Sequence, residues 1–292
     1  MKAQPSGEHR DLLRQLCRRN NLRTALTLGI DWAVIIAAVL VSLRFPLTWV
    51  YLLSVLVISR QMNAISELHH HAIHGNLFRS RWLNDAFEFL YSLPLFTRVS
   101  ADRADHMEHH QTYSVANNDH LVWGRGYGLN PLLQGSRPYM LWFLLIRPFC
   151  GVLQFEALKG IFVNPNWRDR SYRRTMLAFW GLVIAAFALA GRLDLLFWYW
   201  LVPYFTLFQV FFFWDDMMGH YNCPRTGTRE MRGPAFLLIT GHGTTYHNVH
   251  HLYPTIPWFH MPRATRVFVN PEEVDVAYGF WNGIRQMQEP AK

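Results

Sequence analysis

The chain has 292 residues, of which 51% are hydrophobic and only 16% are charged, and its formal net charge is +8. Its mean hydropathy is only +0.01 because apolar blocks alternate with basic, histidine-rich stretches. Basic residues that flank apolar blocks indicate a membrane protein in contact with anionic lipid rather than a nucleic-acid-binding protein. The three cysteines are scattered and lack CxxC spacing, which excludes a disulfide framework and a zinc ribbon.

The N-terminal part of the chain is predicted to be a basic segment followed by a first membrane span. Residues 1–23 are polar and carry five arginines, and no signal peptide is expected there. A short amphipathic helix over residues 11–19 on the membrane surface and a disordered tail are both compatible with this segment. Residues 24–43 form an apolar block of the length that crosses a hydrocarbon core of about 30 Å. Asp31 is the only charge in this block, so it either has a function or pairs locally.

A second helix is predicted from Pro46 to His74, after a turn at residues 44–46. It is longer than the bilayer requires, so its C-terminal end would stand outside the membrane. Residues 86–96 are too short to span the bilayer and predict an interfacial or re-entrant piece. Residues 140–155 are interrupted by Arg147 and Pro148 and end at Glu156, and they predict an amphipathic surface helix.

The third and fourth spans are predicted over residues 176–190 and 193–213, with a kink at Pro203 of the kind that transmembrane helices tolerate. The turns at 44–46 and 191–193 hold few basic residues, whereas nearly all other lysines and arginines lie on the opposite side together with both termini. The positive-inside rule therefore predicts two hairpins with cytoplasmic N- and C-termini.

The sequence thus predicts an all-α integral membrane fold. Four transmembrane helices form two hairpins, and a cytoplasmic helical cap carries the histidine motifs. The expected organisation is a basic cytoplasmic segment over residues 1–23, a membrane domain over 24–262 and a cytoplasmic tail over 263–292. The bacterial inner membrane is the expected location.

Histidines gather in three short motifs that this topology places on the cytoplasmic face. The motifs are HxxxH at His70 and His74, HxxHH at His106, His109 and His110, and HxxHH at His247, His250 and His251. Residues three and four apart share a helix face, and adjacent residues point about 100° apart, so each motif can serve one ion or two neighbouring ions. Eight imidazoles are too many for one ion and suit a two-metal centre. His220, at the end of the fourth span, is a predicted additional ligand.

Other interpretations of the motifs explain less. Surface histidines in cytosolic loops would not require three clusters, haem ligation does not use clustered triplets, and no HExxH zinc motif is present. Imidazole alone does not select the metal, but the scarcity of carboxylates within the motifs favours iron and dioxygen chemistry over hydrolysis. Partners that could orient the rings are Glu67, Asp105, Glu108, Asp216 and Asn248. His242 and His260 are left as outer partners or surface residues, and Asp119 and His120 as residues of an ordinary turn.

At these motifs the chain resembles the membrane fatty acid desaturase superfamily. HHAIHGNLF is similar to its first histidine box, HMEHHQ to the second, and YHNVHHLYPTIPWFHMP to the third with its downstream prolines. The resemblance covers most of residues 24–262. The first cluster departs from the pattern because it also offers His69 and His71, so the pair that binds metal stays open, with His70 and His74 aligning best.

The resemblance implies a non-haem di-iron centre, held by the eight histidines of the boxes and by His220. It also implies that electrons come from a separate ferredoxin-type carrier, since no HPGG motif of a fused cytochrome b5 is present. The expected function is O2-dependent oxidation of an unactivated C–H bond of a fatty acyl or acyl-lipid chain, as a desaturase. A hydroxylase, ketolase or oxidative decarboxylase acting on a lipid or carotenoid is the alternative. A non-enzymatic membrane metal-binding protein is the alternative of another class.

Overall fold

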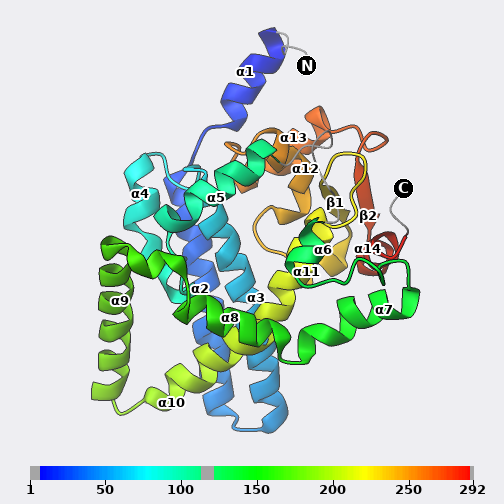
Figure 1. The fold of residues 1–292 in the computed structure, drawn as a ribbon. Helices are drawn as coiled ribbons and strands as arrows, with labels where there is room; N and C mark the ends of the chain where they lie inside the picture. The colour runs from blue at the N-terminus through cyan, green and yellow to red at the C-terminus, as the bar shows by residue number, and fades with distance from the viewer. Residues whose placement is uncertain (1–6, 113–121, 290–292) are drawn as a thin grey trace.

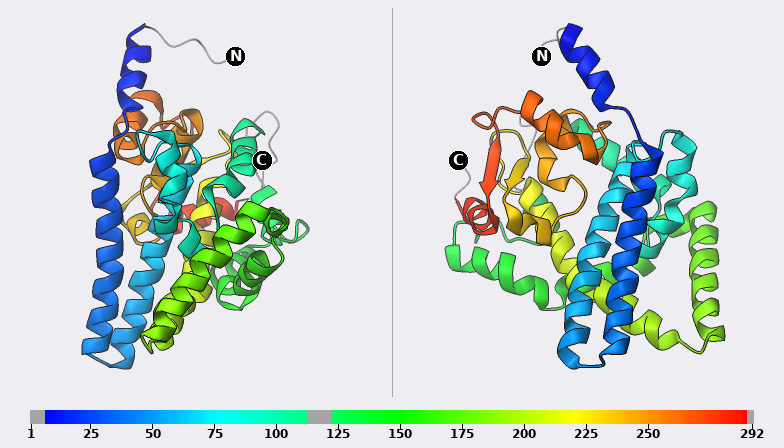
Figure 2. Two further views of the ribbon diagram at one scale, coloured as in Figure 1. Left: turned by 90° about the vertical axis from the view of Figure 1, so that its left-hand side faces the viewer. Right: turned by 180° about the vertical axis from the view of Figure 1, so that it is seen from behind.

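The computed structural model describes residues 7–112 and 122–289. Asp119 and His120, which the sequence places in a turn, lie outside the described residues. The long helices lie at one end of the molecule, and the short helices and the strands gather at the other end (Figure 1). Figure 2 shows the same division from two further sides.

The two longest helices form an antiparallel hairpin. They are α2 (Asn21–Arg44) and α3 (Thr48–Ile73). The side chain of Asn20 caps α2 by accepting a hydrogen bond from the backbone N–H of Arg23. Asp31 is buried in this hairpin, where its carboxylate accepts a hydrogen bond of 2.8 Å from Gln61 Nε2 and one of 2.7 Å from His242 Nε2. The single charge of the first apolar block is therefore paired, with partners on α3 and in the segment before the third histidine motif.

A second pair of long helical segments lies beside this hairpin. The first is α9 (Arg170–Leu189), which Asp169 caps. The second runs without interruption through α10 (Leu193–Leu196), the wide π-helical turns η6 (Phe197–Leu201) and η7 (Tyr204–Phe208), and α11 (Gln209–His220). The π turns flank Pro203, the residue at which the sequence predicts a kink. Proline removes one backbone donor, and a wider turn is one of the local adjustments that accommodate it.

Within the part of the chain that the structure describes, three helices are long and apolar enough to cross a membrane. They cover residues 21–44, 170–189 and 193–220, and so include the first, third and fourth predicted spans. The second predicted span, α3, is not among them, because polar residues such as Arg60, Asn63 and Glu67 occupy its C-terminal half. A bent pair, Arg137–Phe149 and Val152–Arg168, meets the same test as one broken span with a 56° bend. The sequence predicts a surface helix there instead.

The bent pair is built from short helical elements, and so is the segment before α5. The pair contains α7 (Arg137–Leu141), η3 (Trp142–Ile146), η4 (Arg147–Phe149), α8 (Val152–Phe162) and η5 (Pro165–Arg168). Residues 86–96 form two single turns, η1 (Glu88–Leu90) and η2 (Leu93–Leu95), after α4 (Arg81–Ala86). The turn η2 is buried in the protein, which agrees with the prediction that residues 86–96 are too short to span the bilayer.

The expectation of an all-α fold is wrong in one respect. The strands β1 (Arg229–Arg232) and β2 (Asp275–Tyr278) pair in parallel, with Arg229 opposite Asp275 and Arg232 opposite Tyr278. Each strand is only four residues long, and β1 carries three charged residues, so neither shows the alternation that identifies a strand in a sequence. The pair joins the C-terminal part of the chain to the segment between α11 and the third histidine motif.

The remaining described helices surround the three histidine motifs. They are α5 (Val99–Thr112), α6 (Val122–Gly126), η8 (Pro234–Leu238), η9 (Thr244–Tyr246), α12 (His247–Leu252), η10 (Trp258–His260), α13 (Met261–Phe268) and α14 (Phe280–Met287). The N-terminal helix α1 (Gly7–Leu16) buries Leu16 in a cluster with Val249, Ile256 and Met261. An apolar residue of this predicted membrane-surface helix thus contacts the protein itself.

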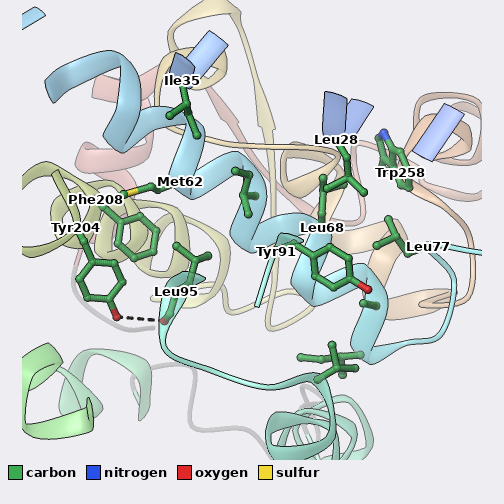
Figure 3. Packing of buried hydrophobic residues seen from close by; sticks show 14 of the residues in the cluster. Leu28, Ile35, Met62, Leu68, Leu77, Tyr91, Leu95, Tyr204, Phe208 and Trp258 are labelled. Carbon is green, nitrogen blue, oxygen red and sulfur yellow. Dashed lines mark hydrogen bonds between the residues drawn. The ribbon is translucent and has the colours of Figure 1, made fainter. Parts of the chain in front are cut away.

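The largest hydrophobic cluster connects the α2–α3 hairpin to the segment 193–220. Figure 3 shows Leu28 and Ile35 of α2 in one cluster with Met62 and Leu68 of α3. Tyr204 packs from the other segment, and its hydroxyl donates a hydrogen bond of 3.3 Å to the backbone oxygen of Leu95. This cluster holds the C-terminal end of α3 in a fixed position, and that end carries the first histidine motif.

Candidate metal centre

The structure brings the three histidine motifs together in two groups of ring nitrogens. One group contains His70, His74, His106, His110 and His250, and the other contains His109, His220 and His251. Within each group the potential ligand atoms all lie within 4.8 Å of one another. The groups draw on α3, α5, α11 and α12, so segments up to 181 residues apart in sequence meet at one place (251 − 70 = 181).

Helix α3 supplies the first motif and distinguishes among its four histidines. The Nε2 atoms of His70 and His74 each lie 2.9 Å from His106 Nε2. These two residues are one helical turn apart and therefore share a face of the helix. The His70 Nδ1–H donates to the Glu67 carboxylate at 3.3 Å, which leaves the Nε2 lone pair directed at the cluster.

The other two histidines of the first motif use both ring nitrogens in hydrogen bonds. His69 lies 2.7 Å from the Ser92 hydroxyl through Nδ1 and 3.0 Å from an Asp102 carboxylate oxygen through Nε2. His71 Nδ1 lies 3.1 Å from the side-chain oxygen of Asn76, and its Nε2 donates to the backbone oxygen of His242 at 3.0 Å. These contacts leave neither ring with a nitrogen directed at the cluster, whereas His70 and His74 have one each.

Helix α5 divides its three histidines between the two groups. His106 and His110 share a face, and their Nε2 atoms are 3.0 Å apart. His109 points to the second group, where its ring centroid is 4.8 Å from that of His220 and 4.9 Å from that of His251. The HxxHH spacing therefore serves both groups from one helix, as the 100° offset of adjacent side chains requires.

Helices α11 and α12 complete the second group and part of the first. His250 Nε2 lies 3.1 Å from His110 Nε2, and His220 Nε2 lies 2.7 Å from His247 Nε2. His247 is outside both groups but contacts the second through His220. The His247 ring packs closely against the backbone of α11 at Gly219. A side-chain carbon at that position would lie only 3.3 Å from the ring.

The donor set fits metal ions better than it fits hydrogen bonds alone. His106 Nε2 has three other Nε2 atoms within 3.0 Å, but a neutral imidazole carries a single N–H and cannot satisfy three such contacts. Ligand nitrogens about 2.1 Å from one ion and at right angles to each other would be about 3.0 Å apart. The separations of 2.9–3.1 Å observed within the first group match that geometry.

Burial keeps these rings in the form that binds metal. It lowers the pKa of His109 to about 4 and, with the neighbouring His109, that of His110 to about 3. It also lowers the pKa of His250 and His251 well below their usual range, with neighbouring histidines adding to the effect. The imidazoles are therefore neutral near pH 7, and neutral imidazole is the ligand form. Each of these rings is buried or half-buried at a shared site, which does not agree with the surface-histidine interpretation.

The predicted outer partners have different environments. Glu67 contacts His70, and Asp216 accepts a hydrogen bond of 2.8 Å from Tyr127 Oη. The side chain of Asn248 donates to the hydroxyls of Thr226 and Thr228 rather than to a histidine. Asp105 and Glu108 are exposed on α5. Among the described residues, the buried Nδ1 atoms of His110, His247 and His250 have no hydrogen-bond partner, so packing orients these rings.

A buried set of residues that sequence reasoning missed fixes the third motif. Glu230 of β1 is 1% exposed, and its carboxylate accepts hydrogen bonds from the backbone N–H groups of Asn248 and Val249 at 3.1 and 3.3 Å. Arg229, which is 0% exposed, donates to the backbone oxygens of Met218 and Tyr221. Strand β1 thus joins the end of α11 to the start of α12.

One cavity borders the histidine groups, and another lies among the membrane-type helices. The first, of about 550 Å³, is bounded by ligand histidines such as His70 and His106, by Phe208 and Phe212, and by carboxylates that include Asp215. The second, of about 460 Å³, is almost entirely apolar and lies among α2, α9 and η6. The first cavity gives a substrate access to the ring nitrogens.

Comparison with known proteins agrees with this geometry. The sequence model of the fatty acid desaturase family matches residues 46–281. The chain is 27% identical to the dihydrorhizobitoxine desaturase of Bradyrhizobium elkanii, over 94% of this chain and 84% of that protein. It is 24% identical to the sn-1 acyl-lipid omega-3 desaturase (ferredoxin) of Nostoc sp. (strain 36), over 89% of this chain and 79% of that protein.

Proposed function

The chain belongs to the fatty acid desaturase family of oxidoreductases, and we propose that it uses two iron ions and O2 to desaturate a fatty acyl or acyl-lipid chain. The observation that carries this proposal is the convergence of the histidine motifs into two adjacent groups of ring nitrogens. The names of both relatives describe desaturation, and one of them acts on an acyl lipid with ferredoxin.

Each group of histidines would hold one ion. The first ion would be bound by the group of five, which is His70, His74, His106, His110 and His250. The second would be bound by His109, His220 and His251, with His247 joining through its contact with His220. Bound iron would supply the one-electron chemistry with O2 that cleaves an unactivated C–H bond. In the overall reaction, O2 takes two hydrogens from the substrate, two electrons from a carrier and two protons from solvent, and gives an alkene and two waters.

The protein's own residues would position the substrate beside the metal pair. Phe208 and Phe212 form apolar walls of the 550 Å³ cavity, and an alkyl chain against them would lie next to His106 and His109. Close-packed side chains around the rings would keep bulk water away from the reacting carbon. The Glu67 carboxylate would hold His70 in the tautomer that presents Nε2 to the metal.

The proposed membrane orientation follows from the distribution of basic residues and the shape of the fold. The hairpin tips at residues 44–48 and 190–193 lie at the end opposite the short helices that carry the histidines (Figure 1). We assign the histidine end of the molecule and both termini to the cytoplasm. Nearly all basic residues outside the two hairpin tips lie on the side opposite those tips. The bacterial inner membrane is the proposed location.

A small polar substrate is the second candidate. The cavity beside the histidines contains several carboxylates, among them Asp102, Asp105, Asp215 and Asp216. Such a wall suits a substrate that carries hydrogen-bond donors near the reacting carbon. Hydroxylation, ketolation and oxidative decarboxylation remain alternative outcomes at the same centre, because they require the same C–H cleavage.

Product analysis tests the proposal. The protein and its His250→Ala variant are expressed in the same host, and lipid extracts and polar metabolites are profiled by mass spectrometry. The proposal predicts a product that lacks two hydrogens, present with the wild type and absent with the variant. Gain of one oxygen atom would instead assign a hydroxylase. Identical profiles for both proteins and the empty control would refute the enzymatic assignment.

A further inference from the structure

A series of aromatic rings leads from the histidine groups to the surface. The ring centroid of His71 is 5.9 Å from that of His70 and 6.2 Å from that of His250. On its other side, His71 is 5.4 Å from Trp258, and Trp258 is 5.0 Å from Phe259. Every step along this series is a direct ring contact, and Phe259 lies at its outer end.

The inner rings of this series are held rigidly. His71 is 1% exposed, and both of its nitrogens are engaged with Asn76 and His242, so it does not share in metal binding. Trp258 is buried at 9% exposure and belongs to the largest hydrophobic cluster, where Figure 3 shows it near Leu77. These residues therefore form a fixed bridge between a ligand-bearing helix and the segment that follows the third motif.

The outer end of the series opens on a basic surface, which we call the basic edge. It comprises residues 18–23, 76–81 and 257–266, which contain seven arginines and one histidine and no carboxylate: Arg18, Arg19, Arg23, Arg79, Arg81, His260, Arg263 and Arg266. The guanidinium of Arg23 lies over the Phe259 ring, 5.0 Å from its centroid.

Direct contacts hold the three segments of the basic edge together. Arg79 donates from Nε to the backbone oxygen of Arg19 at 3.1 Å and from its backbone N–H to the Asn21 side chain at 2.8 Å. Most of the arginines are exposed, including Arg263 and Arg266, which lie one turn apart on α13. A positive surface without carboxylates attracts an acidic partner and speeds its association.

We propose that the basic edge is the docking surface for an acidic iron–sulfur electron carrier, and that Phe259, Trp258 and His71 form the electron path to the metal pair. This inference rests on the proposed function. In each encounter the reduced carrier would lose one electron, which a ferric ion held by the histidine groups would accept. Two encounters supply the two electrons that one turnover consumes, with protons taken from solvent. The ring series favours this partner over an anionic lipid surface, because lipid contact would not require a path to the histidines.

The docking part is tested with full-length protein in nanodiscs of zwitterionic lipid and a plant-type [2Fe–2S] ferredoxin as the probe. The double variant Arg263→Glu with Arg266→Glu is compared with Arg137→Glu with Arg285→Glu, two exposed arginines on α7 and α14 at the far side of the molecule (Figure 1). We expect the first variant to raise the dissociation constant about tenfold at low salt, with the difference lost near 0.5 M salt, where screening acts within about 5 Å. The control pair should bind as the wild type does.

Equal binding by both double variants would overturn the docking site. A loss of affinity for nanodiscs or vesicles of anionic phosphatidylglycerol, without a change in ferredoxin affinity, would assign the basic edge to lipid instead. Binding is measurable on metal-free protein. A protein that binds ferredoxin at this edge but holds no iron would therefore refute the proposed function and leave the docking result standing.

The path is tested by stopped-flow reduction of the iron-loaded protein without substrate. Trp258→Leu should slow oxidation of the ferredoxin several-fold, whereas Trp258→Phe, which retains a ring, should slow it less. Dithionite, a small reductant that does not need the docking surface, should reduce both variants at the wild-type rate. Thermal midpoints identify a variant that fails to fold. Equal ferredoxin rates for wild type and folded Trp258→Leu would overturn the path.

Discussion

Replacement of Glu230 by leucine tests how the third histidine motif is held in place. The Glu230 carboxylate accepts hydrogen bonds from two backbone N–H groups, those of Asn248 and Val249, and its side chain is 1% exposed. Leucine has a similar volume but no acceptor, so both donors would be left buried and unpaired. An unsatisfied buried group costs about 1–3 kcal/mol, which gives about 2–6 kcal/mol for the pair.

The assay is thermal unfolding of the metal-free protein in nanodiscs, with Glu230→Gln as the control. Burial raises the pKa of the Glu230 carboxyl to about 7, so a neutral amide fits the site. The glutamine oxygen can accept the same hydrogen bonds, and its cost should stay below about 1 kcal/mol. A Glu230→Leu protein within about 0.5 kcal/mol of the wild type, the range of a surface substitution, would refute the reasoning.

Four further substitutions have distinct expected outcomes. His74→Ala and His109→Ala each remove a ligand from a different group, so elemental analysis should find close to one iron per chain for either, and two in both would contradict the division into groups. His69→Gln should retain both irons, because its ring bonds to Ser92 and Asp102 instead; its iron content is the readout. Arg229→Met should lower the free energy of unfolding by about 3 kcal/mol or more in denaturant titrations, because buried backbone oxygens lose their donor, and an unchanged value would contradict this.

The family and the convergence of the histidine motifs could be predicted because their signal is local. A motif such as HNVHH needs only the geometry of one helical turn to present its rings, and the pattern of apolar blocks orders the motifs in space. The lengths of the apolar blocks predict the long helices. Three of the four predicted spans lie on helices apolar enough to cross a membrane.

The parts that sequence reasoning missed depend on contacts between distant segments. Asp31 reads as an isolated charge in an apolar block, but its partner His242 is 211 residues away. Glu230 and Arg229 belong to no motif in the sequence, yet both are buried where β1 pairs with β2 and packs against α11. The family resemblance already favours His70 and His74, but spacing alone leaves His69 and His71 open. Their contacts with Ser92 and Asn76, which turn both rings away from the cluster, come from other segments.

The ring series behind the basic edge also depends on contacts between segments that are distant in the sequence. Trp258 and Phe259 follow the third motif in a proline-containing segment, so the sequence gives no periodicity that relates them to His71 on α3. Their contact depends on the fold that brings α3 and the segment after α12 together. The arginines of the basic edge likewise come from three separate segments.

The iron content of the purified protein tests the central claim most directly. The protein is expressed with iron supplementation, isolated without air, and its iron, zinc and copper are measured per chain by elemental mass spectrometry. Eight histidines in two groups, with His247 in contact with the second group, predict two irons per chain, with little zinc or copper. A protein that retains its fold but binds a single ion, another metal or none would contradict the di-iron account.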